Sequence, residues 1–260
     1  MNLKGVGEIK SLILDMDGVL WRENSPIGDL PGIFKRFNDL GLKIILATNN
    51  GTRTPYQYLE KMAGFGLNLQ KDQVVNSAMA LAHLLHKRFP LGGPVYIIGE
   101  EGLRTALTGA GFFHAEENVQ AVIGSMDRTI DFWKLKRATL LIRAGAPFYF
   151  TNPDRTFPTP EGLIPGAGSI LAALEAATDV QPIIAGKPSP ALFELALERL
   201  GTPPEQTMAV GDRLETDILG GQRVGCKTAA VLSGVLTEAE ALAWRPKIDI
   251  IVPELADLVK

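Results

Sequence analysis

The sequence contains little cysteine and histidine: one cysteine, Cys226, and three histidines among 260 residues. A single cysteine cannot form an intramolecular disulfide, so the composition excludes a disulfide scaffold and favours a reducing compartment. The scarcity of sulfur and imidazole groups also excludes a zinc site built from cysteine and histidine. We therefore expect a cytoplasmic protein.

Long apolar runs and an excess of basic residues are absent as well. The first apolar run, Leu12-Ile13-Leu14, stops at Asp15, and no run of about 18 apolar residues occurs in the chain, so we expect no membrane span. The opening residues lack the apolar stretch of a signal peptide. The net charge is -3, which gives no indication of a nucleic-acid partner.

Short apolar runs alternate with helix signals, and this alternation predicts an α/β fold. The runs are apolar on both faces, as in a parallel sheet covered by helices. Helices are predicted between them, over 32–40, over 78–89 after a Ser77 cap, over 190–200, and from a capping box at Thr237. The predicted strands lie at residues 11–14, 43–47, 95–98, 121–123, 147–150, 182–185, 207–210, 228–232 and 249–252.

Four of these strands are followed by polar clusters. The clusters are Asp15-Met16-Asp17-Gly18, Thr48-Asn49-Asn50-Gly51, Gly186-Lys187-Pro188 and Gly211-Asp212-Arg213. Because parallel strands end at one edge of a sheet, where ligands bind, the clusters are expected to meet there. Residues 87–181 have their own βαβαβ pattern and none of these clusters. We therefore expect a Rossmann-like parallel-sheet core, residues 1–86 and 182–260, with an inserted α/β domain over 87–181.

The clusters contain the groups that phosphate and metal chemistry need. Asp15 and Asp17 suit a divalent cation that prefers oxygen, such as Mg²⁺, or a nucleophile beside an acid/base partner. Asp212 is a candidate metal ligand. The Thr48 hydroxyl and the Lys187 ammonium suit phosphate oxygens. Taken singly, each cluster has an ordinary alternative, namely an Asx turn, a solvated lysine or an acidic first turn of a helix.

In chain order the clusters form the series Asp-x-Asp-Gly, Thr-Asn, Lys-Pro and Gly-Asp, with Asp217 five residues after the last Asp. This series resembles the haloacid dehalogenase-like (HAD) superfamily, and in particular its C2-capped phosphatases similar to NagD and the 4-nitrophenylphosphatases. Thr151-Asn152-Pro153-Asp154 and Pro165-Gly166-Ala167-Gly168-Ser169 also match that group. One departure is Gly51, where many relatives carry serine.

The resemblance implies a Mg²⁺-dependent phosphatase that hydrolyses small phosphate monoesters through an aspartyl-phosphate. Asp15 would be the nucleophile, and Asp17 would be the general acid and base. The metal would be held by Asp15, Asp212 and the backbone carbonyl of Asp17. Asp217 would orient a metal-bound water or Lys187. Phosphoryl oxygens would be bound by Thr48, the Asn49 amide and Lys187.

The inserted domain would select the substrate. Its polar stretch Asn152, Asp154, Arg155 and Thr156 would border the leaving group, although an ordinary Asn-Pro-Asp turn is an equal alternative. The expected partner is a small phosphorylated metabolite, and the resemblance allows a homodimer formed through the insert. Two other functions compete: a non-catalytic phosphate-ligand binding or regulatory protein on the same fold, and a phosphomutase.

Overall fold

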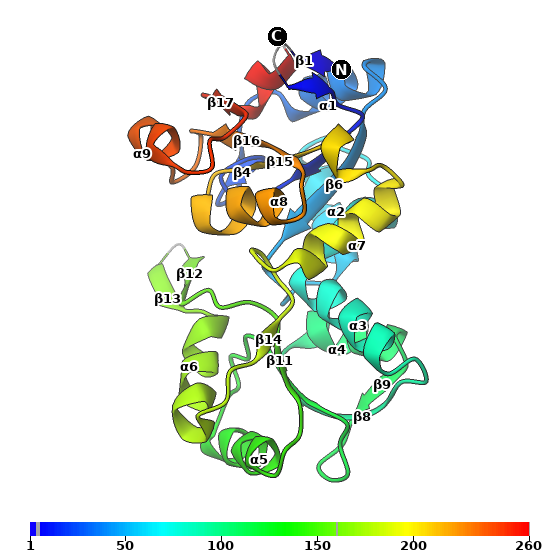
Figure 1. Ribbon diagram of the computed structural model, residues 1–260, viewed down its shortest axis with the longest axis vertical. Helices are drawn as coiled ribbons and strands as arrows, with labels where there is room; N and C mark the ends of the chain where they lie inside the picture. The colour runs from blue at the N-terminus through cyan, green and yellow to red at the C-terminus, as the bar shows by residue number, and fades with distance from the viewer. Residues whose placement is uncertain (4–5, 160, 260) are drawn as a thin grey trace. The chain divides into compact units, whose positions relative to one another are not determined.

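The computed structural model describes residues 1–3, 6–159 and 161–259 (Figure 1). The chain divides into two compact units, one of residues 1–48, 56–75 and 187–260 and the other of residues 49–55 and 76–186. The second unit is larger than the insert expected over 87–181. It includes α3 (Ser77–Arg88), which packs against α4 (Glu101–Gly109), and the loop 49–55, which receives a hydrogen bond from Asn76 at Arg53 O.

The first unit contains a six-stranded sheet with the order β17-β16-β15-β3-β6-β7. The neighbouring pairs from β17 to β6 are parallel. Five of the strands were predicted to within one residue, and β7 was not predicted. The bounds are β3 (Ser11–Leu14), β6 (Lys43–Thr48), β7 (Val74–Asn76), β15 (Thr207–Gly211), β16 (Lys227–Val231) and β17 (Ile250–Val252).

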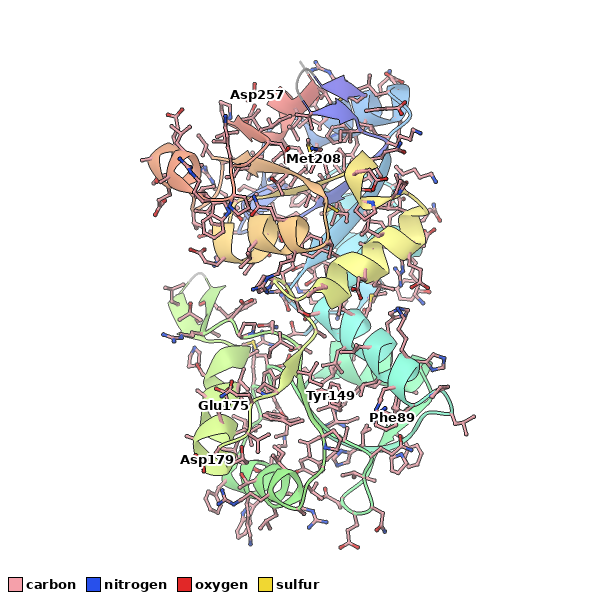
Figure 2. All side chains as sticks on the ribbon, in the orientation of Figure 1. Phe89, Tyr149, Glu175, Asp179, Met208 and Asp257 are labelled. Atoms are coloured by element: carbon pink, nitrogen blue, oxygen red, sulfur yellow. The ribbon has the colours of Figure 1, made fainter. Side chains whose placement is uncertain are left out.

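Helices cover both faces of this sheet. Alternate strand residues such as Leu14 and Met208, the latter labelled in Figure 2, pack in one core with side chains of α1 (Leu30–Asp39) and α2 (Pro55–Gly64). The other face lies against α7 (Pro190–Leu200) and α8 (Leu219–Arg223), which contact β6 and β16 respectively. Burial on both faces explains why these strands are continuous apolar runs rather than alternating ones.

The smaller elements of the first unit lie in its connections. They are the paired strands β1 (Asn2–Leu3) and β2 (Gly7–Glu8), the paired strands β4 (Trp21–Arg22) and β5 (Ser25–Pro26), α9 (Glu238–Ala243), the 3-10 helices η1 (Lys71–Gln73), η2 (Pro204–Gln206) and η4 (Leu255–Val259), and the π-helical turn η3 (Leu214–Ile218).

The second unit is built around a five-stranded parallel sheet with the order β14-β11-β10-β8-β9. One face carries a core formed with α5 (Phe132–Arg143) and α6 (Ala167–Thr178). An antiparallel hairpin, β12 (Thr156–Thr159) and β13 (Gly162–Pro165), follows β11. The sheet strands are β8 (Gly93–Ile98), β9 (Phe112–His114), β10 (Val122–Gly124), β11 (Phe148–Phe150) and β14 (Ile183–Ile184).

Some helix boundaries follow the sequence signals, but α1 begins at Leu30, two residues before the predicted start of that helix. Thr237 and Glu240 form the predicted capping box of α9, and Gly201 ends α7 in the left-handed conformation, φ 60°. The prediction that Ser77 caps α3 is wrong, because the Asn76 side chain accepts from Met79 N instead. The Ser77 hydroxyl donates to the backbone oxygen of Asn49, 2.5 Å away.

Two aromatic side chains of the second unit lie at the surface. Phe132 and Trp133 are 70% and 68% exposed at the start of α5, where they contact each other edge to face. Cys226, by contrast, is buried. Across the described part of the chain, no helix combines the length and the apolar character needed to cross a membrane.

Candidate active site

The carboxyl ends of β3, β6 and β15 lie side by side. The strand register pairs Leu14 with both Leu46 and Val210, and the Asp15 backbone N–H donates to Val210 O at 2.9 Å. The strands that follow β3 in the sequence lie first on one side of it, as β6 and β7, and later on the other side, as β15, β16 and β17. The carboxyl end of β3 is therefore at the topological switch point, where open α/β sheets bind ligands. Asp15 and Asp212 therefore leave the sheet at its binding edge.

Lys187 connects two of the acids at this edge. Its ammonium donates to Asp15 Oδ1 at 2.5 Å, to Asp217 Oδ1 at 2.6 Å and to the backbone oxygen of Ala47 at 3.1 Å. The Lys187 side chain is only 4% exposed. Three hydrogen bonds hold this buried ammonium at the end of β3. The two bonds to carboxylates connect Lys187 with acids that lie 172 and 30 positions away in the sequence.

The acids at this edge outnumber the cation. Burial raises the pKa of Asp15 well above its usual value, although Lys187 opposes the shift. Burial also raises the pKa of Asp212, with a further contribution from Asp217. For Lys187, burial favours the neutral form, but the two adjacent carboxylates outweigh it and raise the pKa. A second positive charge at this place would stabilise the ionised acids.

The donor set fits a divalent cation. Among residues 1–3, 6–159 and 161–259, the cluster capable of holding a metal is Asp15, Asp212 and Asp217, with ligand oxygens within 4.8 Å of one another. Within the described residues, the Asp212 Oδ1 atom is buried and has no hydrogen-bond partner, while Oδ2 accepts from Val235 N at 2.9 Å. An all-oxygen set of carboxylates is typical of Mg²⁺ and not of zinc or copper.

Glycines on two loops make room for Asp212. A Cβ atom at Gly18, where φ is +82°, would lie 2.4 Å from Asp212 Oδ2, and a Cβ at Gly234 would lie 1.8 Å from it. Neither distance is sterically possible, so the close approach of the backbone to this carboxylate requires glycine at both positions. Gly18 belongs to the first polar cluster recognised in the sequence, whereas Gly234 was not singled out there.

Asp17 lies outside the acid cluster and is exposed. Its Oδ1 accepts a hydrogen bond from the indole N–H of Trp21 at 2.6 Å. The resemblance implies that Asp17 binds the metal through its backbone carbonyl. The cluster of side-chain carboxylates gives no information on that carbonyl. Sequence reasoning missed Trp21, although a buried tryptophan usually needs an acceptor for its N–H group.

In the second unit, Asn49 lies against the predicted substrate-selecting stretch. Its side-chain amide approaches both carboxylate oxygens of Asp154, at 3.3 and 3.5 Å. The buried Asn152 amide donates to Asn49 O at 2.8 Å, and Asn152 Oδ1 accepts from Asp154 N at 3.1 Å. The Asn152 side chain thus forms an Asx turn with Asp154 N, as in the Asn-Pro-Asp turn that was the alternative to a substrate-selecting role. The same turn places the Asp154 carboxylate next to the Asn49 side chain.

The other predicted residues of this stretch are placed differently. Arg155 and Thr156 are exposed, and Thr156 begins the β12–β13 hairpin opposite Pro165. The Arg155 backbone oxygen accepts from Gly166 N and from the Ser169 hydroxyl. Thr48, in the first unit, is buried at the end of β6.

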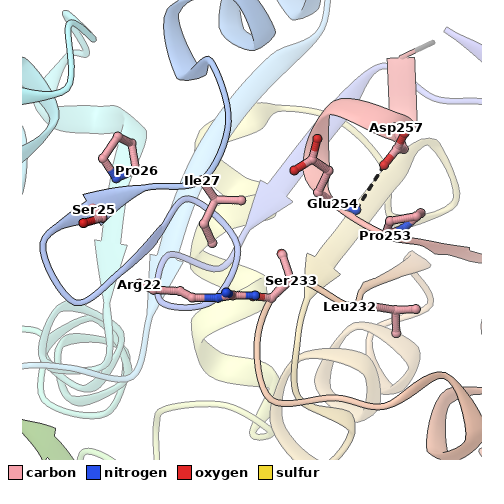
Figure 3. A pocket seen from close by; sticks show the side chains of 9 residues that line it. All are labelled: Arg22, Ser25, Pro26, Ile27, Leu232, Ser233, Pro253, Glu254 and Asp257. Atoms are coloured by element: carbon pink, nitrogen blue, oxygen red, sulfur yellow. Dashed lines mark hydrogen bonds between the residues drawn. The ribbon is translucent and has the colours of Figure 1, made fainter.

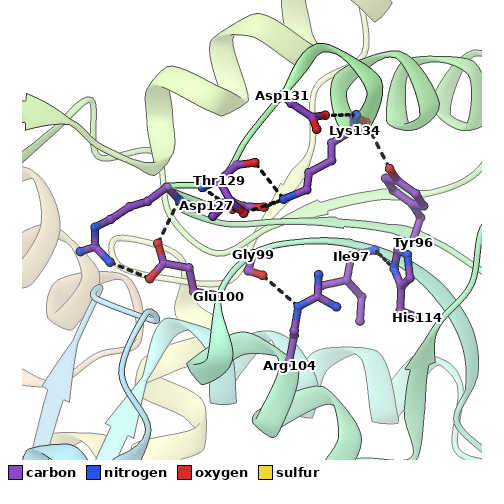
Figure 4. A network of polar contacts seen from close by, with 11 residues as sticks. Tyr96, Ile97, Gly99, Glu100, Arg104, His114, Asp127, Thr129, Asp131 and Lys134 are labelled. Atoms are coloured by element: carbon purple, nitrogen blue, oxygen red, sulfur yellow. Dashed lines mark hydrogen bonds and ion pairs between the residues drawn. The ribbon is translucent and has the colours of Figure 1, made fainter.

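The second unit also carries a polar network at the ends of β8 and β10 (Figure 4). Glu100 accepts from the backbone N–H of Arg128 at 3.0 Å and from its guanidinium at 2.7 Å. Lys134 donates to the buried Asp127 at 2.8 Å. Burial alone raises the pKa of Asp127, but hydrogen bonds from Lys134 and Thr129 outweigh it and lower the pKa. The sequence analysis did not identify these residues.

A pocket of about 680 Å³ lies in the first unit beyond β16 and β17 (Figure 3). Its lining includes Arg22, Ser233, Glu254 and Asp257 but none of the clustered acids. Arg22 Nε donates to Ser233 O at 2.6 Å, and the Ser233 hydroxyl donates to Gly18 O at 2.7 Å. The pocket wall therefore supports the glycine turn beside Asp212.

Comparison with known proteins agrees with this geometry. Residues 12–113 match the family model described as haloacid dehalogenase-like hydrolase, and residues 184–258 match one described as HAD-hydrolase-like. A dihydroxyacetone phosphatase from Corynebacterium glutamicum is 35% identical over 248 residues, which are 95% of this chain and 90% of that protein.

Solved structures agree in fold as well. A p-nitrophenyl phosphatase from Archaeoglobus fulgidus has a TM-score of 0.90 at 32% identity, covering 97% of this chain and 98% of its own. A glycerol phosphate phosphatase from Mycobacterium tuberculosis, solved with magnesium, has a TM-score of 0.89 at 33% identity, covering 97% and 77%. The predicted similarity to NagD and the 4-nitrophenylphosphatases is confirmed. The chain belongs to the haloacid dehalogenase-like hydrolase family.

Proposed function

We propose that this chain hydrolyses small phosphate monoesters with Mg²⁺ as cofactor and with a phosphorylated Asp15 as intermediate. The observation that carries the proposal is the buried Lys187, which bridges Asp15 and Asp217 beside Asp212. No donor among the described residues reaches the buried Oδ1 of Asp212. The similarity to a dihydroxyacetone phosphatase, an acid sugar phosphatase and a glycerol phosphate phosphatase supports the same reaction class.

In the first half-reaction, a carboxylate oxygen of Asp15 attacks phosphorus while Lys187 holds Oδ1 in place. The bond between phosphorus and the leaving oxygen breaks, and Asp17 donates a proton to that oxygen. In the second half-reaction, Asp17 takes a proton from a water molecule whose oxygen attacks phosphorus. The bond between phosphorus and Asp15 then breaks, which releases phosphate and restores both acids.

The remaining residues bind the charged groups of the reaction, namely the phosphoryl oxygens, the cation and the Lys187 ammonium. Thr48, the Asn49 amide and Lys187 bind the phosphoryl oxygens. Asp15, Asp212 and the Asp17 backbone carbonyl would hold the cation, which when bound would supply positive charge against the phosphoryl group and the carboxylates. Asp217, fixed by Lys187 at 2.6 Å and by Arg213 N at 3.2 Å, orients the ammonium.

We assign the chemistry to the first unit and the choice of substrate to the second. Asp154, presented by Asn152, is the foremost candidate for contact with the leaving group, and Arg155 and Thr156 lie next to it. The substrate class that we propose is a small phosphorylated metabolite. A cytoplasmic location remains a prediction from the sequence, and a homodimer remains what the family resemblance allows.

The test is phosphate release from a panel of phosphorylated metabolites, with Mg²⁺ and with EDTA, by wild type and by Asp15→Asn. The amide cannot attack phosphorus, so turnover should fall by several orders of magnitude, roughly as when a catalytic nucleophile is removed elsewhere. Reduction with tritiated borohydride after acid quench should label Asp15 in wild type only.

Asp249→Asn is the matched control, because this acid also accepts hydrogen bonds at a strand, from Thr228, but lies outside the acid cluster. It should retain wild-type turnover. Near-normal turnover by Asp15→Asn, with deamidation excluded by mass spectrometry, would contradict the proposed nucleophile. Metal-independent turnover by wild type would contradict the role of Mg²⁺.

A further inference from the structure

We propose that Trp21 is a positioning residue that fixes the carboxyl group of Asp17 for proton transfer, and that Lys61 holds the indole ring in place for this task. The inference rests on the proposed function, in which Asp17 is the general acid and base. Neither Trp21 nor Lys61 belongs to the motifs that identify the acids.

The hydrogen bond to Asp17 is short and comes from a fixed donor. Trp21 lies in β4, is 1% exposed and donates through Nε1 to Asp17 Oδ1 at 2.6 Å. The backbones of the two segments are also hydrogen-bonded. Gly18 N donates to Trp21 O at 2.8 Å, and Asp17 forms a β-bridge with Trp21. Asp17 is thus tied to Trp21 through both main chain and side chain.

The indole ring is held by groups from and just after α2. The Lys61 ammonium lies 4.1 Å from the Trp21 ring centroid and donates to Glu23 O at 2.9 Å. The Phe65 ring lies 6.0 Å from the indole, tilted by 42°. A cation over an aromatic face is attracted by the negative charge of that face, so the ring has little freedom to rotate.

The two carboxylate oxygens of Asp17 therefore have different roles. Oδ1 is occupied by the indole N–H, and no hydrogen bond within the described residues reaches Oδ2. The oxygen that exchanges the proton with the substrate is therefore Oδ2, held at one orientation. Because a misplacement of about 1 Å can reduce a rate by about a hundredfold, this restraint should matter most where the leaving oxygen most needs a proton.

The test compares kcat/KM for 4-nitrophenyl, phenyl and 4-methylphenyl phosphate. These esters have similar shape, but the need for protonation of the leaving oxygen increases along the series. Trp21→Phe keeps an aromatic ring and removes the N–H. We expect a loss of about 3-fold or less for 4-nitrophenyl phosphate and about 30-fold or more for 4-methylphenyl phosphate, within the range of general acid catalysis.

Two further variants separate positioning from packing. Replacing Trp21 by benzothienylalanine, a tryptophan isostere with sulfur in place of N–H, keeps the shape of the ring and should give the same unequal losses. Lys61→Met should give smaller losses in the same order, and Lys61→Arg should restore the wild-type pattern because arginine also binds aromatic faces.

The matched control is Trp244→Phe, which also removes an indole hydrogen bond in the first unit, to Gln222 Oε1 at 3.1 Å. It should leave the pattern across the three esters unchanged. Equal losses on all three esters for the benzothienylalanine variant would show that Trp21 only supports the fold. If wild type releases phosphate with Mg²⁺ neither from these esters nor from the metabolite panel, the proposed function fails and the positioning role fails with it.

Discussion

Replacing Lys187 by methionine tests the charge balance of the acid cluster. The side chain is nearly isosteric, but the ammonium that bridges Asp15 and Asp217 is lost. Both carboxylates are largely buried, with side chains 12% and 4% exposed. Water therefore cannot replace the lost ammonium fully, and the folded state is left with uncompensated negative charge.

The expected loss of stability is large for one substitution. Removing one partner of a buried ion pair typically costs about 3–5 kcal/mol. With a urea dependence near the upper end of about 1–3 kcal/mol per molar, as expected for a protein of this size, the unfolding midpoint should fall by about 1–2 M. The double variant Lys187→Met/Asp217→Asn should recover part of this loss, because it removes one of the carboxylates left unpaired.

The assay is urea unfolding followed by tryptophan fluorescence in EDTA, so that bound metal adds nothing to stability. Lys134→Met serves as the matched control, because Lys134 also bonds a buried acid, Asp127, outside the cluster. That variant should be less stable than wild type yet keep its turnover when folded. Lys187→Met should lose turnover by about 10²–10³-fold, as when a donor to a developing charge is removed.

Two results would refute this reasoning. The first is a urea unfolding midpoint of Lys187→Met equal to that of wild type. It would mean that other groups neutralise the negative charge of the acids when the ammonium is removed. The second is a double variant no more stable than the single one, which would mean that the cost comes from lost packing and not from unpaired charge.

Three further predictions follow from the structure. EDTA should abolish turnover, Mg²⁺ should restore it and Ca²⁺ should inhibit, because Ca²⁺ accepts more ligands at longer distances; equal rates with both ions would contradict this. Burial raises the pKa of Cys226 to about 12, so the reactive thiolate should be scarce until the pH approaches that value. Iodoacetamide at pH 8 should therefore modify the folded protein slowly and the urea-unfolded protein faster, which mass spectrometry can measure. Asp154→Ala should lower kcat/KM for the best metabolite substrate more than for 4-nitrophenyl phosphate, and equal losses would assign Asp154 to the fold.

The sheet strands could be predicted because their residues are buried on both faces. A run such as Leu12-Ile13-Leu14 is too short for a helix and is bounded by turn residues, which favours a buried strand. The hairpin β12–β13 was missed because it contains proline and exposed residues, which argue against a strand. β7 was missed because Val74–Asn76 runs directly into α3 without a turn.

The side-chain contacts could be predicted only where a sequence pattern carried them. Asp15 and Asp212 follow strands, so their common edge follows from parallel pairing. The contact between Asn49 and Asp154 joins positions 105 apart and has no local signal. Ser77 and Asn76 are both good helix caps, and the tertiary bond from the Ser77 hydroxyl to Asn49 O is consistent with Asn76 taking the cap.

The number of charges distinguishes the functional cluster from a structural pair in the same chain. Around Asp127, one carboxylate meets one ammonium with two hydrogen bonds from Thr129, and the pKa of the acid is lowered despite burial. Around Lys187, three carboxylates cluster beside one ammonium, which bonds Asp15 and Asp217, and the pKa values of Asp15 and Asp212 are raised. A fold selected for stability alone gains nothing from this surplus of buried acid, because each unpaired charge costs free energy. A bound cation and a transferring phosphoryl group would give the surplus a use, and such perturbed groups are typical of catalytic sites.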